Sequence, residues 1–151
     1  MSLKERIDSD LKAAMLGGDK TLATTLRGLK SAILYVEVAE GKREQGLADQ
    51  EIVGVLRKEA KKRQESAELF DRGGNQEKAV AERHELVVIE NYLPAQLSDE
   101  EIGKLVDRAI DDVGAATSQD MGRIIGRVKE LSKGDADGGR IAAAVKQRIS
   151  G

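Results

Sequence analysis

The sequence predicts an all-α protein with an N-terminal four-helix domain, residues 1–94, and a small three-helix tail domain, residues 95–151. Three observations lead to this prediction. Apolar residues recur at helical spacing along the chain, and no stretch alternates apolar and polar residues as a strand would. Aromatic residues make up only 2%, so the core must come from aliphatic side chains that favour helices. The only proline, Pro94, should stop a helix because it lacks an amide donor.

Two helices are expected at the N-terminus. Ser2 and Glu5 form a Ser-x-x-Glu capping box, in which side chains satisfy the backbone donors of a helix start. The apolar residues of this helix are spaced four apart and should share one face: Leu3, Ile7, Leu11 and Met15. Gly17-Gly18 should end the helix, and Asp19 is a suitable N-cap for the next one. The second apolar stripe consists of Leu22, Leu26, Leu29, Ile33 and Val36.

Two further helices should follow the polar loop 41–46. The first is expected from about Asp49 to Asp71. Its inner side consists of Ile52, Leu56, Ala60, Ala67 and Phe70. Gly73-Gly74 should break it, and Asn75 can cap the next helix. The apolar residues of that helix are Ala79, Leu86, Ile89 and Leu93.

Three shorter helices should form the tail domain. Ser98 and Glu101 form a second capping box. The stripe that follows it consists of Ile102, Leu105, Val106, Ala109, Ile110 and Val113. Ser118 is the expected N-cap of the next helix, whose apolar residues are Met121, Ile124, Ile125, Val128 and Leu131. The glycine-rich loop 134–139 should lead into the last helix, with Ile141, Val145 and Ile149 facing inward.

Composition narrows the class of protein. Hydrophobic residues make up 40% and charged residues 34%, which is typical of a folded chain with a heavily charged surface. The sequence has no cysteine, so disulfides, thiolate chemistry and cysteine-based zinc sites are excluded and a reducing compartment is expected. No long apolar stretch is present, so we expect neither a signal peptide nor a membrane span, and we expect a cytoplasmic protein.

Catalytic and metal-binding patterns are scarce. The single histidine, His84, lies between glutamates on a charged stretch, and we interpret it as a surface residue. Asp135-x-Asp137 matches the start of an EF-hand calcium loop. The match then fails, because Gly139 takes the third acidic position and Arg140 that of the obligatory glycine. The sequence therefore predicts no catalytic residue, no cofactor and no metal ion.

Two basic regions could contact RNA. The first lies on the third helix and contains Arg57, Lys58, Lys61, Lys62 and Arg63. Glu59 can pair with Arg63, and we favour a solvated helix face there. The second lies in the tail, and its candidate RNA contacts are Arg123, Arg127, Lys129, Lys133 and Arg140. No aromatic residue lies nearby on which a base could stack, so any RNA recognition should depend on the sugar–phosphate backbone or on the shape of the RNA.

The start of the last helix is a possible phosphate site. Free backbone amides and the helix dipole there would suit an anion next to these cations. Asp137 could equally be the N-cap of that helix, and the residues alone leave the two interpretations balanced. Gly122 and Gly126, four residues apart inside a helix, cost helix stability and predict the close approach of another helix.

Several segments, in the same order along nearly the whole chain, resemble the GatB/YqeY family. They are Leu26-Arg27-x-Leu29-Lys30-Ser31-Ala32, Leu56-Arg57-Lys58-Glu59-x-Lys61-Lys62-Arg63-x-Glu65-Ser66, Tyr92-Leu93-Pro94, Leu97-Ser98-Asp99-Glu100-Glu101, Asp120-Met121-Gly122, Gly126 and Asp135-Ala136-Asp137-Gly138. Each segment alone is a weak signal, but the ordered set is specific. By position, Gly122, Gly126 and Gly138 match the structural glycines of the family's tail.

In larger family members the matching region is the C-terminal part of the B subunit of the Asp/Glu-tRNA amidotransferase, where it helps to hold the tRNA. The resemblance therefore implies a tRNA-binding accessory protein whose partner is tRNA or a tRNA-handling complex. It also implies a family-level carbon–nitrogen ligase activity with glutamine as amido-nitrogen donor, although we expect no active site within this chain. The alternative is a helical protein–protein adaptor without RNA contact, which an exposed apolar groove would favour.

Overall fold

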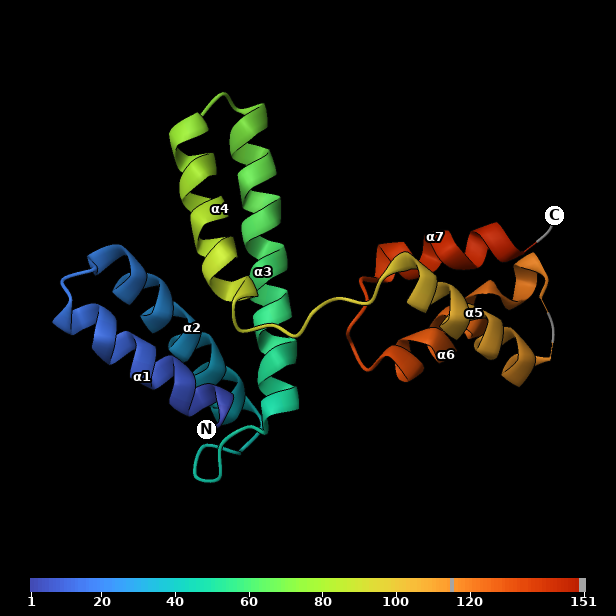
Figure 1. Cartoon of the computed structure of the whole chain (residues 1–151), viewed down its shortest axis with the longest axis horizontal. Coiled ribbons are helices and arrows are strands. Elements are labelled where there is room, and N and C mark those ends of the chain that lie inside the picture. The colour runs from blue at the N-terminus through green and yellow to red at the C-terminus, as the bar shows by residue number, and fades with distance from the viewer. Residues whose placement is uncertain (115, 150–151) are drawn as a thin grey trace. The chain divides into compact units, whose positions relative to one another are not determined.

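The structure is a computed structural model that describes residues 1–114 and 116–149 (Figure 1). Every regular element within these residues is helical, so the predicted all-α class is confirmed. The elements are α1 (Leu3–Leu16), α2 (Lys20–Ala39), α3 (Asp49–Arg72), α4 (Gln76–Glu90), α5 (Asp99–Val113), the 3-10 turn η1 (Ser118–Asp120), α6 (Met121–Ser132) and α7 (Gly138–Arg148). Their contacts divide the chain into two compact units, Met1–Leu93 and Pro94–Gly151.

The first unit consists of two helical hairpins that share one apolar core (Figure 1). α1 packs mainly on α2, α3 packs mainly on α4, and α3 also contacts both helices of the other hairpin. The largest fully buried apolar side chains come from all four helices: Ile7, Leu26, Leu29, Ile33, Ile52, Leu56 and Ile89. All seven belong to the predicted apolar stripes, so those inner faces are confirmed.

The end of α1 differs from the prediction. Met15 is 54% exposed, and Ala14 at 5% takes its place against the core. A helix needs 3.6 residues per turn, so a row of residues four apart drifts by about 40° at each step. Met15 is three steps from Leu3, and by then the row has turned away from the core.

Most predicted helix starts are confirmed by hydrogen bonds from backbone amides to the capping side chain. The capping residues are Ser2, Asp19, Asn75 and Ser98. The prediction for Ser118 is wrong, because that residue already belongs to η1 ahead of α6. The carboxylate of Asp120 instead accepts from the backbone N–H and the hydroxyl of Thr117, at 3.3 and 2.8 Å. The helical turn before α6 therefore starts after Thr117, one residue earlier than expected.

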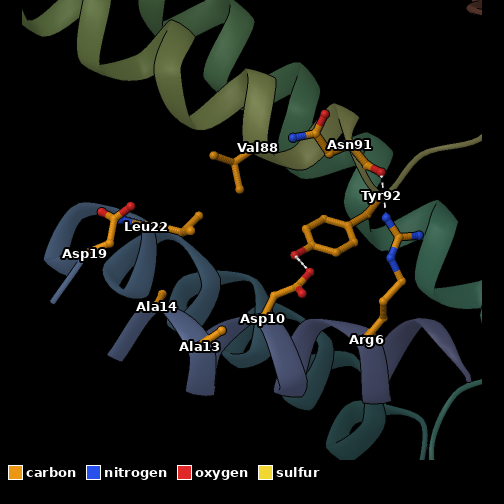
Figure 2. A pocket seen from close by; sticks show the side chains of 9 residues that line it. All are labelled: Arg6, Asp10, Ala13, Ala14, Asp19, Leu22, Val88, Asn91 and Tyr92. Carbon is orange, nitrogen blue, oxygen red and sulfur yellow. Dashed lines mark hydrogen bonds between the residues drawn. The ribbon is translucent and has the colours of Figure 1, made fainter. Parts of the chain in front are cut away.

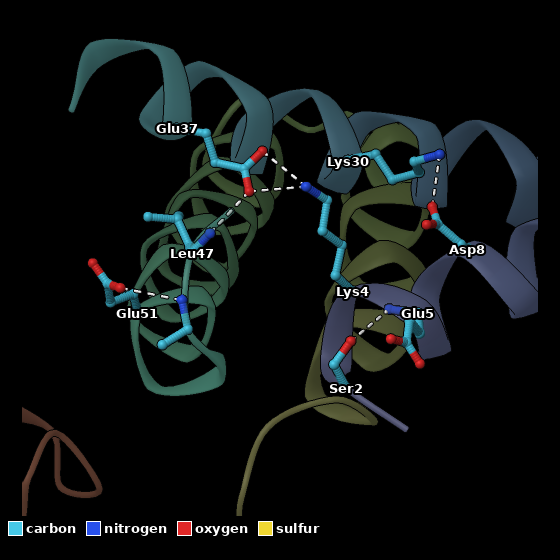
Figure 3. A network of polar contacts seen from close by, with 9 residues as sticks. Ser2, Lys4, Glu5, Asp8, Lys30, Glu37, Leu47 and Glu51 are labelled. Atoms are coloured by element: carbon cyan, nitrogen blue, oxygen red, sulfur yellow. Dashed lines mark hydrogen bonds and ion pairs between the residues drawn. The ribbon is translucent and has the colours of Figure 1, made fainter. Parts of the chain in front are cut away.

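Glu37 on α2 is a buried carboxylate that the apolar pattern does not predict (Figure 3). Its side chain is 1% exposed and accepts from the Lys4 ammonium group at 3.0 and 2.9 Å. It also accepts from the backbone N–H of Leu47 at 3.0 Å. The hydrogen bond from Lys4 is the largest cause that lowers the pKa of Glu37 below its ordinary value. One carboxylate thereby joins α1, α2 and the loop before α3.

Tyr92 fastens the end of α4 to α1 beside a cavity of about 530 Å³ (Figure 2). Its hydroxyl donates to Asp10 at 2.5 Å, and the Arg6 guanidinium lies over its ring at 4.9 Å from the centroid. Arg6 also donates to the carbonyl of Asn91 at 3.0 Å. Burial, followed by the Asp10 hydrogen bond, raises the pKa of Tyr92. Because these polar groups satisfy one another, we interpret them as an anchor between helices.

The second unit has a separate core. α5, α6 and α7 all contact one another, and their buried apolar residues are Ile102, Val106, Ala109, Ile124, Val128, Ile141 and Val145. The backbone N–H of Leu97 donates to the carbonyl of Asp135 at 2.9 Å, which ties the segment before α5 to the loop before α7. The predicted stripes of all three helices therefore converge on one small core.

Candidate nucleic-acid interface

The five candidate contact residues lie on α6, at its C-terminal end and at the start of α7. Ile124 and Val128 of α6 are fully buried in the core, so the rest of the helix surface is free to carry charge. The exposed candidates are Arg123, Lys129 and Lys133. The half-buried candidates are Arg127 and Arg140. The structure gives these five cations different partners, and the partners decide what each cation can bind.

Two of the arginines are held by carboxylates. Arg127 donates from Nε to Asp112 and from a terminal nitrogen to Glu130, each at 3.0 Å. The hydrogen bond with Asp112, and then that with Glu130, raises the pKa of Arg127. Arg140 donates to Asp99 at 2.7 Å. Each arginine would have to exchange its carboxylate for a phosphate before it could bind RNA.

Arg123 is held more loosely than the other two arginines. Its nearest carboxylate is that of Asp120 at 3.5 Å, and its side chain is 67% exposed. Asp120 itself is occupied by Thr117, whose side-chain and backbone hydrogen bonds are the leading causes that lower the pKa of Asp120. An exposed ion pair of this kind is worth little, so Arg123 can exchange its partner easily.

The backbone amides at the start of α7 are already engaged. The carboxylate of Asp137 accepts from the N–H of Gly139 at 3.0 Å and from the N–H of Arg140 at 3.3 Å. The sequence left open whether this helix start binds a phosphate or is capped by Asp137. The structure favours the cap, because the carboxylate occupies two of the donors that an anion would need.

Lys129 and Lys133 form no ion pair with a carboxylate among the described residues. Lys129 extends across to α7, where its Cε and Nζ lie 3.7 and 3.9 Å from the position that a Cβ on Gly138 would take. Its ammonium group therefore lies beside the first residue of α7. Lys133 follows four residues later, at the C-cap of α6. This corner has the least compensated positive charge of the candidate surface.

Lys133 has an unusual backbone conformation for its residue type. Its φ is 53°, and among the described residues every other positive φ belongs to glycine. A side chain in this left-handed region costs roughly 1 kcal/mol relative to glycine. Replacing Lys133 by glycine is therefore expected to raise the free energy of unfolding of the second unit by about 1 kcal/mol, as measured by urea denaturation. The matched change Lys129→Gly lies inside α6 and should lower that free energy by about 1 kcal/mol. Destabilisation by both changes would contradict the strain at Lys133.

Gly122 and Gly126 lie on an open part of α6. Both are exposed, and apart from their own neighbours and the backbone of α6 no atom lies within 4 Å of the position that a Cβ would take on either residue. The predicted close approach of another helix is therefore wrong within the part of the chain that the structure describes. The two glycines leave the backbone of α6 bare toward solvent.

The basic stretch of α3 is a solvated face only at its lysines, because the side chains of Arg63 and Glu59 are 18% and 12% exposed. Glu59 accepts from Arg63 at 2.9 Å, as the spacing predicts, and also from Lys62 at 3.0 Å. Lys58 and Lys61 are exposed on the same helix. These lysines give a useful reference for the tail, because they carry the same charge on another surface.

His84 is exposed on α4, and it lines neither the cavity at Tyr92 nor the groove between α1 and α2 described below. No three His, Asp or Glu side chains within residues 1–114 and 116–149 are placed to hold a metal ion together. Within the same residues, no helix combines the length and apolarity needed to cross a membrane.

Sequence reasoning missed the carboxylates that hold Arg127 and Arg140. A signal was present, because the stretch 97–119, which contains α5, is acidic and directly precedes the basic region. Charge along a chain does not say which helix faces which, so the pairing of Asp112 and Asp99 with these arginines needed the structure.

Taken together, these features define an all-helical protein of two compact units, the second of which has a partly neutralised basic surface. Over residues 4–149 the chain matches the family described as Yqey-like protein, and it belongs to that family. The resemblance to stand-alone proteins of this kind, which rested on short ordered segments, is thereby confirmed. A search of curated proteins found no match.

Proposed function

We propose that the protein is a tRNA-binding accessory protein and that its second unit contacts the phosphate backbone through Lys129 and Lys133. The observation that carries this proposal is the position of the Lys129 ammonium group beside Gly138, the first residue of α7. Two lysines without acidic partners among the described residues together create a local positive potential, to which the N-terminus of α7 adds little because the Asp137 carboxylate caps it. Such a potential attracts a phosphate without reading the sequence of the RNA.

The surroundings support contact with the backbone of the RNA. The aromatic residues of the chain are Tyr35, Phe70 and Tyr92, all in the first unit, so the second unit has no ring on which bases could stack. The bare backbone at Gly122 and Gly126 allows a sugar–phosphate strand to come close to α6. Recognition in this proposal depends on charge and shape.

The proposed binding is weak and supports chemistry performed elsewhere. Arg127 and Arg140 are held by carboxylates, and the whole chain has a net charge of −2. A protein that binds tRNA tightly by itself usually has a broad basic surface. We therefore propose that this protein acts in the cytoplasm within a tRNA-handling complex. In that complex a partner would supply any carbon–nitrogen ligase chemistry with glutamine as the amido-nitrogen donor.

Salt dependence provides the test. Two phosphate contacts should give a slope of about −1.5 when the logarithm of the tRNA binding constant is plotted against that of the salt concentration. The double change Lys129→Ala with Lys133→Ala should remove most of this slope and weaken binding at low salt by about tenfold. The control is Lys58→Ala with Lys61→Ala on α3, which removes the same charge from another exposed surface.

Equal losses in the two double variants would show that only net charge matters, and they would overturn the proposed site. A wild-type chain that binds no tRNA at low salt would overturn direct tRNA recognition altogether. The alternative of a protein–protein adaptor would then be the better account of the fold.

A further inference from the structure

The first unit has a groove between α1 and α2 that the proposed function does not use. Its volume is about 490 Å³, and its floor is formed by Ile7, Leu11, Ile33 and Leu34. Leu34 is 44% exposed, whereas Ile7, Leu11 and Ile33 are at most 8% exposed, so Leu34 is the part of this floor that a partner could contact. The cations Lys4, Arg27 and Lys30 line the same groove.

The charge around this groove is unevenly compensated. Lys4 is held by the buried carboxylate of Glu37, and its charge is therefore neutralised. Lys30 pairs with Oδ1 of Asp8 at 2.7 Å, and that oxygen is buried, so opening the pair would leave a buried carboxylate oxygen without a partner. Arg27 has no acidic partner among the described residues. The groove therefore combines an apolar floor with positive charge at its rim.

The fold explains the leucines of this segment of α2 but not all of its cations. Leu26 and Leu29 are fully buried in the core of the first unit. Lys30 contributes a half-buried ion pair to the packing of α2 on α1, whereas Arg27 contributes no ion pair among the described residues. A guanidinium group without an internal role, beside an exposed apolar floor, is a feature of binding surfaces.

We propose that this groove binds an amphipathic, acidic helix of a partner protein. Apolar side chains of that helix would contact Leu34, and flanking Asp or Glu side chains would pair with Arg27. An RNA backbone fits the groove less well, because an apolar floor offers it no hydrogen bonds and no ring lines the groove. The proposal is independent of tRNA binding, which concerns the other unit.

The test uses a fluorescent synthetic peptide of about 14 residues, or four helical turns, with leucines at positions i, i+3, i+7 and i+10 and glutamates on the other faces. Its anisotropy is measured against the full chain. Arg27→Glu should weaken peptide binding by about tenfold, because it replaces an attractive charge by a repulsive one. Leu34→Ser should weaken it by about fivefold, because it removes apolar contact surface. The matched controls on α3, Lys61→Glu and Leu69→Ser, should leave the affinity unchanged. Leu34 and Leu69 are 44% and 64% exposed and lie outside the buried core, so the serine variants should fold.

A peptide with lysine in place of glutamate provides the second comparison, and it should bind much more weakly than the acidic one. Equal binding of the two peptides, equal effects of the groove and control variants, or no binding of the acidic peptide at low salt would overturn the proposal. Loss of tRNA binding in Arg27→Glu with peptide binding intact would assign the groove to RNA instead. A concentration-dependent dimer that Leu34→Ser dissociates would assign it to a second copy of the chain. Either result would also overturn the proposal.

Discussion

Replacing Glu37 by alanine is expected to lower the free energy of unfolding of the first unit by about 2–3 kcal/mol. The carboxylate is 1% exposed and accepts hydrogen bonds from Lys4 and from the backbone N–H of Leu47. Its removal leaves that N–H without its acceptor and the Lys4 ammonium group without its counter-ion, next to a cavity. Urea denaturation followed by circular dichroism measures the loss. The control Glu40→Ala removes an exposed carboxylate nearby and should change stability by less than about 1 kcal/mol.

The same carboxylate should make the stability of the first unit depend on pH. The pKa of Glu37 is lowered from its ordinary value of 4.5, mainly by the hydrogen bond from Lys4. A group whose pKa is lower in the folded state stabilises the fold fully above its unfolded pKa. Its contribution is lost as the pH falls through the folded pKa, so the loss belongs to the acid range below about 4.5. Glu37→Gln should flatten this part of the profile, and an unchanged acid profile would contradict the role of Glu37.

Replacing Ile124 by alanine is expected to lower the free energy of unfolding of the second unit by about 2–5 kcal/mol. Ile124 is completely buried between α5, α6 and α7, and the truncated side chain would leave a cavity. A unit of this size has little stability to lose, so much of it should unfold near 37 °C. The core of the first unit shares no residue with this one and should keep its fold.

Thermal unfolding and limited proteolysis can separate the two units. We expect a wild-type-like transition for residues 1–93, a second transition at lower temperature, and a protease-resistant fragment that ends near Leu93. The control Ile125→Ala changes a partly buried neighbour and should cost about 1 kcal/mol. A single transition in which both units unfold together would show that the two cores are coupled.

The helices and most of their buried apolar residues could be predicted from the sequence. Leu26, Leu29 and Ile33 recur at the helical period, and a helix of this length can bury such a stripe only on one face. The prediction failed at Met15, where a strict spacing of four drifted off the buried face and Ala14 took the position. A small residue contributes little to a hydrophobic pattern even when it is completely buried.

The pairing of the polar side chains could not be predicted, because it joins residues that are far apart in the sequence. In the sequence, nothing distinguishes Glu37 from an exposed glutamate on a helix. Its burial depends on Lys4, which lies 33 residues earlier. The availability of Arg127 is decided in the same way by Asp112, 15 residues away. Charge along the chain pointed to the tail as the candidate interface, and tertiary pairing then left Lys129 and Lys133 as its strongest members.

RNA contact by the second unit is tested most directly by titrating the isotope-labelled wild-type chain with tRNA at low salt. The titration is monitored by NMR spectra of the backbone amides. We predict that the largest shifts fall on Lys129, Lys133, Gly134 and Gly138, with smaller shifts around Gly122 and Gly126, and that added salt reverses them. Shifts confined to residues 1–93, or spectra that do not change at a tRNA excess, would contradict the account.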